Sequence, residues 1–165
     1  MAVSTSTGGV EVRPSRIGLG LFATERFVAG DTILRIDGRL VNWRELLKRR
    51  GSFMDNCYRF GPETYLDPGD RPARYVNHSC VPNAAVHKAR NRLYLVAVAA
   101  ISAGREITFD YSTTIADDDI WTMRCRCGSP QCRRIIRNFG SLPQGLRKKY
   151  VNRGMVPGFI LRVFV

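Results

Sequence analysis

Four side chains that can bind a metal or a ligand follow one another in the segment RYVNHSCVPN, at Asn77, His78, Ser79 and Cys80. A carboxamide, an imidazole, a hydroxyl and a thiol in a row are compatible with a metal site, a nucleophile or a buried turn. The segment alone does not choose between these chemistries. The choice depends on which residues elsewhere in the chain can join it.

A cluster of cysteines stands near the C-terminus, in the segment CRCGSPQC, at Cys125, Cys127 and Cys132. Three thiols so close together in an intracellular protein indicate zinc rather than a disulfide framework. Structural zinc takes four ligands in a tetrahedron, so a residue from elsewhere must supply the fourth. The candidates for that position are Cys80, Cys57, His78 and His87.

Composition indicates an ordinary globular domain. The chain has 165 residues, of which 44% are hydrophobic and 24% are charged. No apolar run approaches the roughly 20 residues that span a bilayer, so no membrane partner is expected. The segment MAVSTSTGGVEV lacks the basic flank and apolar core of a signal peptide. We therefore expect a cytosolic or nuclear-type compartment, in which disulfides are rare.

Positive charge is concentrated towards the C-terminus. The whole chain has a net charge of +12, and its last 46 residues hold 10 basic residues and no acidic one. This pattern is compatible with a solubilising tail, or with a surface that meets an anionic partner such as nucleic acid or an acidic protein. Charge alone does not identify the partner.

The elements that must position these residues are mostly strands. Apolar or alternating runs predict strands within residues 20–27, 31–41, 91–101 and 105–111. Helices are expected over 42–50, where Asn42 can cap the first turn, and over 144–154, which ends at Gly154. Residues 61–72 hold three prolines and two glycines and are expected to form an ordered loop.

Together these segments resemble one protein family. The glycine motif RIGLGLFATERFVAGD, then RYVNHSCVPN, GREITFDY and CRCGSPQC, is similar in order and spacing to a SET-domain protein-lysine N-methyltransferase with a post-SET zinc motif. The similarity runs from about Arg13 to Arg137. It implies a mainly β fold, with small curved sheets around a knot-like core, few short helices and a C-terminal zinc-bound post-SET segment.

The resemblance divides the chain into four parts: a flexible N-terminus (1–12), the SET domain (13–112), a post-SET zinc segment (113–137) and a basic C-terminal extension (138–165). The extension resembles the ends of small stand-alone, bacterial-type members. A cytoplasmic location is expected, with the nucleoid or a host nucleus as alternatives for a bacterial protein.

The resemblance also implies the cofactor and metal residues. Asn77 matches the asparagine that holds the amino acid end of the methyl donor S-adenosylmethionine (SAM), and His78 contacts the same cofactor through its backbone. One structural zinc is implied, and Cys57 is left over as a packed thiol. For Ile136, core packing is an equal alternative to a contact with the adenine. Further cofactor contacts are implied for Gly18, Leu19, Gly20, Arg74, Tyr75 and Ile136, and the zinc ligands are Cys80, Cys125, Cys127 and Cys132.

Three aromatic residues are implied in catalysis. Tyr111 matches the catalytic tyrosine, and Tyr58 matches a second tyrosine of the lysine channel. Methyl transfer from a sulfonium to a neutral amine requires alignment and exclusion of water rather than a metal or a covalent intermediate. Phe109 stands where family members carry Phe or Tyr, and phenylalanine leaves room for two or three methyl groups. We therefore predict a SAM-dependent protein-lysine N-methyltransferase that di- or trimethylates its substrate.

The expected substrate is a lysine of a protein, with a histone or histone-like protein favoured over a ribosomal or host protein. The basic C-terminal region is a candidate contact for nucleic acid or a nucleosome. For the acidic run Asp117–Asp119, a place beside the peptide groove and a solvated loop are both open. One alternative is a SET-like module that binds protein or nucleic acid without turnover, against which Asn77, Tyr58 and Tyr111 argue. The other is a zinc-ribbon nucleic-acid binder, which leaves NHSC and ITFDY without a role.

Overall fold

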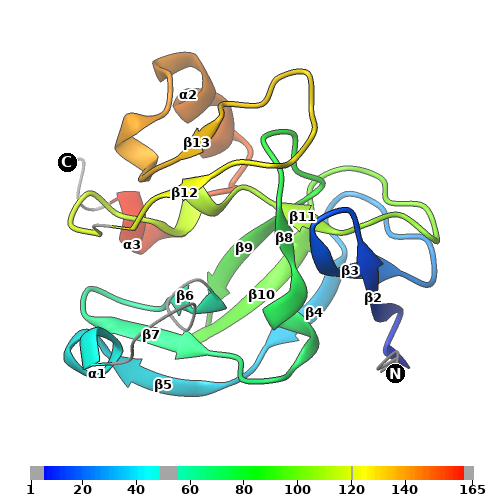
Figure 1. Ribbon diagram of the computed structural model, residues 1–165, viewed down its shortest axis with the longest axis horizontal. Coiled ribbons are helices and arrows are strands. Elements are labelled where there is room, and N and C mark those ends of the chain that lie inside the picture. The colour runs from blue at the N-terminus through cyan, green and yellow to red at the C-terminus, as the bar shows by residue number, and fades with distance from the viewer. Residues whose placement is uncertain (1–5, 49–55, 120, 162–165) are drawn as a thin grey trace.

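The computed structural model describes residues 6–48, 56–119 and 121–161, and small sheets make up most of the regular secondary structure in this part of the chain (Figure 1). Three of the sheets have three strands each. The first holds β1 (Ser6–Thr7), β2 (Val10–Ser15) and β3 (Gly18–Ala23). The second has the order β4 (Thr32–Ile36), β10 (Arg92–Ala97), β9 (Ala84–Ala89), and the third has the order β5 (Arg39–Asn42), β7 (Thr64–Asp67), β6 (Tyr58–Arg59).

Two further sheets have two strands each, and they contain or flank the motifs NHSC, ITFDY and CRCGSPQC. β8 (Asn77–His78) pairs in parallel with β11 (Thr108–Phe109), so the NHSC segment runs beside ITFDY. β12 (Met123–Arg124) pairs antiparallel with β13 (Ile135–Ile136) and brackets the cysteine-rich loop. Both ladders join segments that the sequence motifs single out.

The helices are short. They are α1 (Trp43–Lys48), α2 (Gln144–Asn152) and α3 (Gly158–Leu161), with 3-10 turns η2 (Pro72–Tyr75), η3 (Tyr111–Thr114) and η4 (Phe139–Ser141). None of the helices in the described ranges has the length and hydrophobicity to cross a membrane. The prediction of a mainly β chain with few short helices is confirmed.

The predicted helix boundaries follow from local chemistry. The backbone N–H of Glu45 donates to Asn42 Oδ1 at 2.8 Å, which is the expected cap of α1. Residues 49 and 50 of the predicted first helix lie outside the described residues. The chain leaves α2 at Gly154, whose φ of 62° is a left-handed conformation that glycine adopts without strain.

One segment prediction is wrong. Residues 61–72 are not only a loop, because β7 lies within them and buries Tyr65 and Leu66 against its neighbouring strands. The prolines flank this strand rather than interrupt it. At the N-terminal end of the described chain, β2 packs into the core, since Val10 is 1% exposed and Val12 3% exposed. β9 was not predicted, and its alanines have a weak preference for strands.

The C-terminal extension is part of the packed fold. In Figure 1, β12, β13, α2 and α3 form a layer above the three larger sheets. The apolar side chains of the C-terminal extension pack on Ala85 of β9 and on Ala116, which follows η3. The residues that fill this contact are Phe139, Leu142, Tyr150, Met155, Val156 and Ile160.

One buried carboxylate links this layer to the sheets. Asp110 is 1% exposed and lies between β11 and η3. Arg133, from the cysteine-rich segment, donates to it through two nitrogens, at 2.5 and 2.7 Å. Tyr150 of α2 donates its hydroxyl to the same carboxylate at 2.9 Å. Burial and the neighbouring Asp110 raise the pKa of Tyr150, so the hydroxyl keeps the proton that it donates.

Replacing Tyr150 with phenylalanine removes one donor from this buried acceptor. We expect Tyr150→Phe to lower the free energy of unfolding by about 1–3 kcal/mol, the typical cost of a buried polar group that loses a partner. Urea denaturation followed by circular dichroism measures this. The control Val151→Ala, at an exposed position of the same helix, should stay within about 0.5 kcal/mol of wild type. Equal stability of Tyr150→Phe and wild type would contradict the role given to the hydroxyl.

Candidate active site

A narrow cavity of about 70 Å³ opens beside β11 and η3. The ring centroids of Phe109 and Tyr111 are 4.8 Å apart, and those of Tyr58 and Phe109 are 5.7 Å apart. The structure therefore brings the three predicted catalytic residues together on one wall. Such a cavity suits an aliphatic chain that ends in an amine. The aromatic side chains around it are Trp43, Tyr58, Tyr65, Phe109, Tyr111 and Trp121.

Two tyrosine hydroxyls at this wall are turned towards backbone carbonyls. Tyr111 donates to the carbonyl of Val76 at 2.8 Å, and Tyr58 donates to the carbonyl of Ala73 at 2.6 Å. Burial raises the pKa of Tyr58 well above its usual value, so it is neutral at physiological pH. Since each hydroxyl gives its proton to a carbonyl, each oxygen acts towards a ligand as an acceptor.

The acidic run lies beside the same cavity and is partly neutralised. Arg59, which is 4% exposed, donates to Asp118 at 2.5 Å and to Asp119 at 2.8 Å. Tyr65 donates its hydroxyl to Asp119, which lines the cavity. The hydrogen bond from Arg59 holds the pKa of Asp118 below its usual value. The run therefore attracts a basic peptide less strongly than three unpaired carboxylates would.

Asn77 follows Val76 in the chain, and hydrogen bonds from its side-chain amide nitrogen hold it in place. This nitrogen donates to Glu106 Oε1 at 2.7 Å, to the carbonyl of Leu19 at 3.0 Å and to Ser15 Oγ at 3.3 Å. None of the hydrogen bonds among the described residues uses the carboxamide oxygen of Asn77. That oxygen is therefore suited to accept a hydrogen bond from the amino group of a ligand.

The glycine motif approaches this asparagine closely. A Cβ on Gly20 would lie 2.5 Å from Glu106 Oε1 and 3.1 Å from Asn77 Nδ2, so a larger residue there would displace the Glu106 carboxylate that binds Asn77. Gly18, with a φ of 116°, needs glycine for its backbone conformation. Leu19 between them is 45% exposed. The turn thus presents backbone and one exposed side chain next to the Asn77 clamp.

A cleft of about 770 Å³ separates the glycine turn from the cysteine-rich segment. Gly18 lines it, but several other predicted cofactor residues do not. Arg74 lines the aromatic cavity, and Tyr75 packs against the main core. Ile136 is fully buried beside the cysteines and packs as a core residue. The predicted cofactor residues therefore do not all meet in one place.

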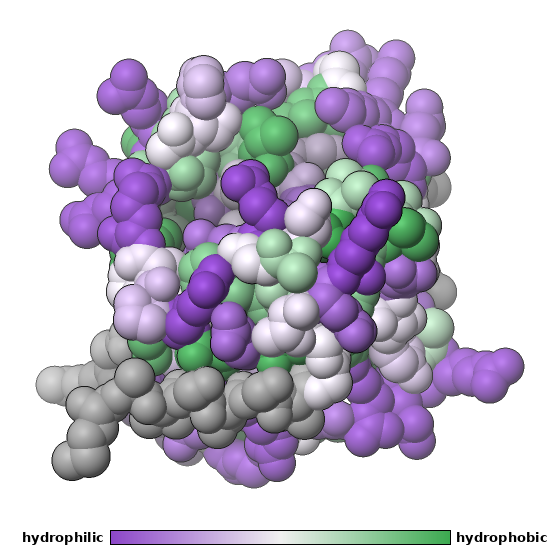
Figure 2. Space-filling model, turned by 90° about the vertical axis from the view of Figure 1, so that its right-hand side faces the viewer, coloured by the Kyte–Doolittle hydropathy of each residue, from purple (hydrophilic) through white to green (hydrophobic). Residues whose placement is uncertain are grey.

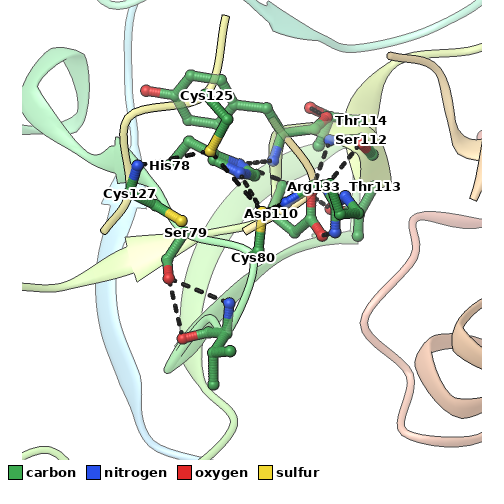
Figure 3. Close-up of polar contacts among 12 residues, drawn as sticks. His78, Ser79, Cys80, Asp110, Ser112, Thr113, Thr114, Cys125, Cys127 and Arg133 are labelled. Atoms are coloured by element: carbon green, nitrogen blue, oxygen red, sulfur yellow. Dashed lines mark hydrogen bonds and ion pairs between the residues drawn. The ribbon is translucent and has the colours of Figure 1, made fainter. Parts of the chain in front are cut away.

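Three thiols and an imidazole meet beneath this cleft (Figure 3). The donor atoms of His78, Cys80, Cys125 and Cys127 all lie within 4.8 Å of one another. The sulfurs of Cys80 and Cys125 are 3.8 Å apart. A tetrahedron with Zn–S bonds of ~2.3 Å has sulfur–sulfur edges of about 3.8 Å, so the donor set fits one zinc ion. Cys132 packs against the same cluster, but it is not one of the four residues whose donor atoms lie within 4.8 Å of one another.

His78 and Cys132 compete for the fourth ligand position. His78 Nδ1 accepts a hydrogen bond from the backbone N–H of Tyr111 at 3.2 Å. Burial lowers the pKa of His78 to about 4, so at neutral pH its one ring proton is on Nε2, which lies 3.3 Å from Cys80 Sγ. A protonated nitrogen donates to a thiolate and does not coordinate a metal. This geometry favours Cys132 as the fourth ligand.

The other candidates for that position lie elsewhere. Cys57 packs against the cluster of Val41, Leu46 and Tyr65 and lines the aromatic cavity. His87 belongs to β9, and burial lowers its pKa. Neither is in the group of clustered donors.

Several functional groups were not predicted from the sequence. Asp110 and Glu106 stand within GREITFDY, from which only Phe109 and Tyr111 were singled out. Arg59 and Arg133 were not predicted because each acts on a carboxylate far away in the chain. The sequence offered one signal for these groups. Glu106 and Asp110 stand in a segment predicted to form a strand, and a carboxylate buried in a strand requires partners.

Comparisons with known proteins agree with this arrangement. A protein of Mycosarcoma maydis described as "Histone-lysine N-methyltransferase, H3 lysine-4 specific" is 33% identical over 129 residues, which cover 71% of this chain and 9% of that protein. The chain thus spans only a small part of the length of this curated relative.

Two crystal structures of KRYPTONITE share the fold. One, in complex with mCHG DNA and SAH, has a TM-score of 0.61 and 26% identity and covers 78% of this chain and 29% of that one. The other, in complex with mCHH DNA, H3(1-15) peptide and SAH, has a TM-score of 0.60, 25% identity and the same coverage. The SET domain model matches residues 18–112, which is more than half of the chain. This chain belongs to the SET domain family.

Proposed function

We propose that this protein transfers methyl groups from SAM to a lysine side chain of a protein. The observation that carries the proposal is the aromatic cavity, at whose wall the Tyr111 hydroxyl binds the carbonyl of Val76, next to the Asn77 clamp. The aromatic cavity, which can hold the lysine, and the Asn77 clamp, which can hold the cofactor, are thus connected through the adjacent residues Val76 and Asn77. The descriptions of the relative and the SAH in the similar structures support the same reaction.

The cofactor side is formed by Asn77 and the glycine turn. SAM, when bound, supplies a methyl group on a positively charged sulfur, which is already activated for transfer. Asn77 would accept from its amino group through the carboxamide oxygen, because Glu106 and the Leu19 carbonyl hold the amide nitrogen. Gly20 keeps the space beside the clamp open.

The lysine side is formed by the aromatic cavity. An apolar environment lowers the pKa of a lysine, since it disfavours the charged form, and thus presents a neutral amine. The oxygen of Tyr111 accepts a hydrogen bond from that amine and directs its lone pair, and it can also contact the polarised methyl hydrogens. The cavity walls exclude water, so the chain supplies alignment rather than a covalent intermediate.

The substrate we propose is a histone or histone-like protein. The relative is described as a histone-lysine methyltransferase, and one similar structure contains an H3(1-15) peptide. We also propose that the basic C-terminal region contacts nucleic acid or a nucleosome. The absence of any acidic residue from the last 46 residues supports this contact.

We infer that Cys80, Cys125, Cys127 and Cys132 hold one structural zinc. The sulfur spacing and the position of the His78 proton support this ligand set. Zinc would fix the cysteine-rich segment beside the glycine turn, since the two line one cleft.

The first test of the reaction is Tyr111→Phe. Initial rates with labelled SAM and core histones should fall by about 100-fold, the size typical of one positioned polar group, while SAM binding measured by calorimetry stays nearly unchanged. Tyr94→Phe, outside the cavity, should keep wild-type rates. Equal turnover in Tyr111→Phe and wild type would remove the role of Tyr111. If wild type methylates neither core histones nor proteins of its source extract, the proposed function is wrong.

A second test concerns the metal. Protein purified without chelator should contain one zinc per chain, and chelation should lower its melting temperature because structural zinc contributes folding free energy. Cys132→Ser should lose zinc. His78→Asn should keep it with an affinity about 10–100-fold lower, since a hydrogen bond to a ligand is lost. Cys57→Ser is the control and should keep full zinc. Zinc retained by Cys132→Ser and lost by His78→Asn would reverse the assignment.

A third test concerns the number of methyl groups. Phe109 cannot hold a water in the space of a further methyl group, so wild type should reach di- or trimethyl-lysine when SAM is in excess. Phe109→Tyr should shift the product towards monomethyl-lysine without slowing the first transfer. Mass spectrometry of a peptide product at long times measures this. A wild-type product that stops at one methyl group would contradict the role given to Phe109.

A further inference from the structure

β12, β13 and the residues beside them carry a concentration of positive charge. Between Trp121 and Leu161 the described chain contains neither Asp nor Glu. We use the name arginine hairpin for the four exposed arginines of this region, Arg124, Arg126, Arg134 and Arg137.

The cysteines determine where two of these arginines lie. Cys125 is buried and Cys127 half-buried, whereas Arg124 and Arg126 between and beside them are exposed. Side chains of an extended segment alternate between its two sides. The backbone that turns the thiols inward therefore holds these arginines on the outer surface.

The arginine hairpin is not neutralised within the protein. In residues 6–48, 56–119 and 121–161, none of its four members forms an ion pair with a carboxylate. By contrast, Arg133 is paired with Asp110, and Arg59 with Asp118 and Asp119. Clustered charges of one sign with no internal partner produce a field that attracts the opposite charge from solution.

A fifth arginine extends this surface. Arg16 donates to the carbonyl of Arg126 and lines the same cleft as Arg126 and Arg134. In Figure 1 the loop between β12 and β13 lies at the top of the molecule, and Figure 2, which shows the molecule from the right of that view, has long hydrophilic side chains around the upper half of its face. The positive surface thus continues from the hairpin onto the glycine turn.

The position of the arginine hairpin matters for the substrate. Arg134 shares its cleft with Gly18 of the glycine turn. Arg137 lines a cavity of about 340 Å³ together with Asp119 and Trp121, which also line the aromatic cavity. A basic peptide would be repelled by these arginines on its way to Tyr111. A polyanion that carries the basic substrate would be attracted instead.

We propose that the arginine hairpin binds the phosphate backbone of nucleic acid, so that the protein acts on a basic protein bound to nucleic acid. The action on a protein bound to nucleic acid rests on the proposed methyl transfer, whereas the binding of nucleic acid does not. All four residues are arginine, whose planar guanidinium bonds a phosphate through two nitrogens. Duplex DNA carries one negative charge per ~1.7 Å of axis, so it presents several phosphates to a group of cations with no acidic residue among them.

The test measures binding of the zinc-loaded protein to a labelled duplex of about 20 base pairs by fluorescence anisotropy over a range of salt concentrations. The variant combines Arg124→Gln, Arg126→Gln and Arg134→Asn. Asparagine is used at position 134 because Arg134 has a φ of 70°, a conformation that asparagine tolerates. The control combines Arg26→Gln, Arg92→Gln and Arg105→Gln, three exposed arginines outside the hairpin, with the same change in net charge.

We expect the slope of log affinity against log salt to fall by about 1 for each arginine removed from the hairpin, and therefore by about 3 in the variant. The control should keep the wild-type slope. Arg124→Gln alone, which leaves the cysteine-rich loop unchanged, should lower the slope by about 1. Equal losses in variant and control would overturn the proposal, because net charge would then explain the binding. An unchanged slope in both Arg124→Gln and the triple variant would also overturn it.

Two further measurements separate the alternatives. In the first, poly-glutamate competes with the duplex at an equal concentration of negative charge. If poly-glutamate displaces the duplex, the surface binds acidic proteins, and the proposal is overturned. Duplex binding is measured without SAM or peptide, so it is independent of turnover. A protein that binds the duplex as expected and methylates no lysine would disprove the proposed function and leave the hairpin assignment supported. A protein that methylates a free peptide and does not bind the duplex would overturn the hairpin assignment alone.

Discussion

The buried carboxylate of Asp110 is the group on which the arrangement of the site depends. Arg133 binds it with two hydrogen bonds and Tyr150 with a third, so the cysteine-rich segment and α2 are both fixed to the end of β11. Tyr111 is the next residue in the chain. Breaking one side of a buried ion pair typically costs about 3–5 kcal/mol, because the remaining charge has no partner. The C-terminal extension thus contributes to the position of the aromatic cavity.

A second constraint is the parallel ladder of β8 and β11, which explains how NHSC serves two sites. Successive side chains of a strand point to opposite sides, so Asn77 and His78 diverge. Asn77 is bound to Glu106 beside the glycine turn. His78 is buried, accepts from the Tyr111 backbone and faces the sulfur of Cys80. One short segment therefore joins the cofactor side to the metal cluster, and Tyr111 is hydrogen-bonded to the residues on either side of Asn77, Val76 and His78.

The sequence could predict what depends on local pattern. Alternating apolar runs predicted the mainly β fold, and the resemblance to SET-domain methyltransferases implied the convergence of Tyr58, Phe109 and Tyr111 and the clustering of thiols around Cys80. It could not predict partners that are distant in the chain, such as Arg133 and Tyr150, which lie 23 and 40 positions from Asp110. Long-range pairing leaves no periodicity to detect. For the same reason the sequence did not predict that Arg59 binds two carboxylates of the acidic run.

The most direct test of this account is a crystal structure of the zinc-loaded protein with S-adenosylhomocysteine. The ligand should lie against the glycine turn, with its amino group bonded to the carboxamide oxygen of Asn77, and the aromatic cavity beside Tyr111 should stay open for a lysine. Electron density for the ligand inside the aromatic cavity, or away from Asn77 altogether, would contradict the separation of cofactor and lysine sites on which the proposed methyl transfer rests.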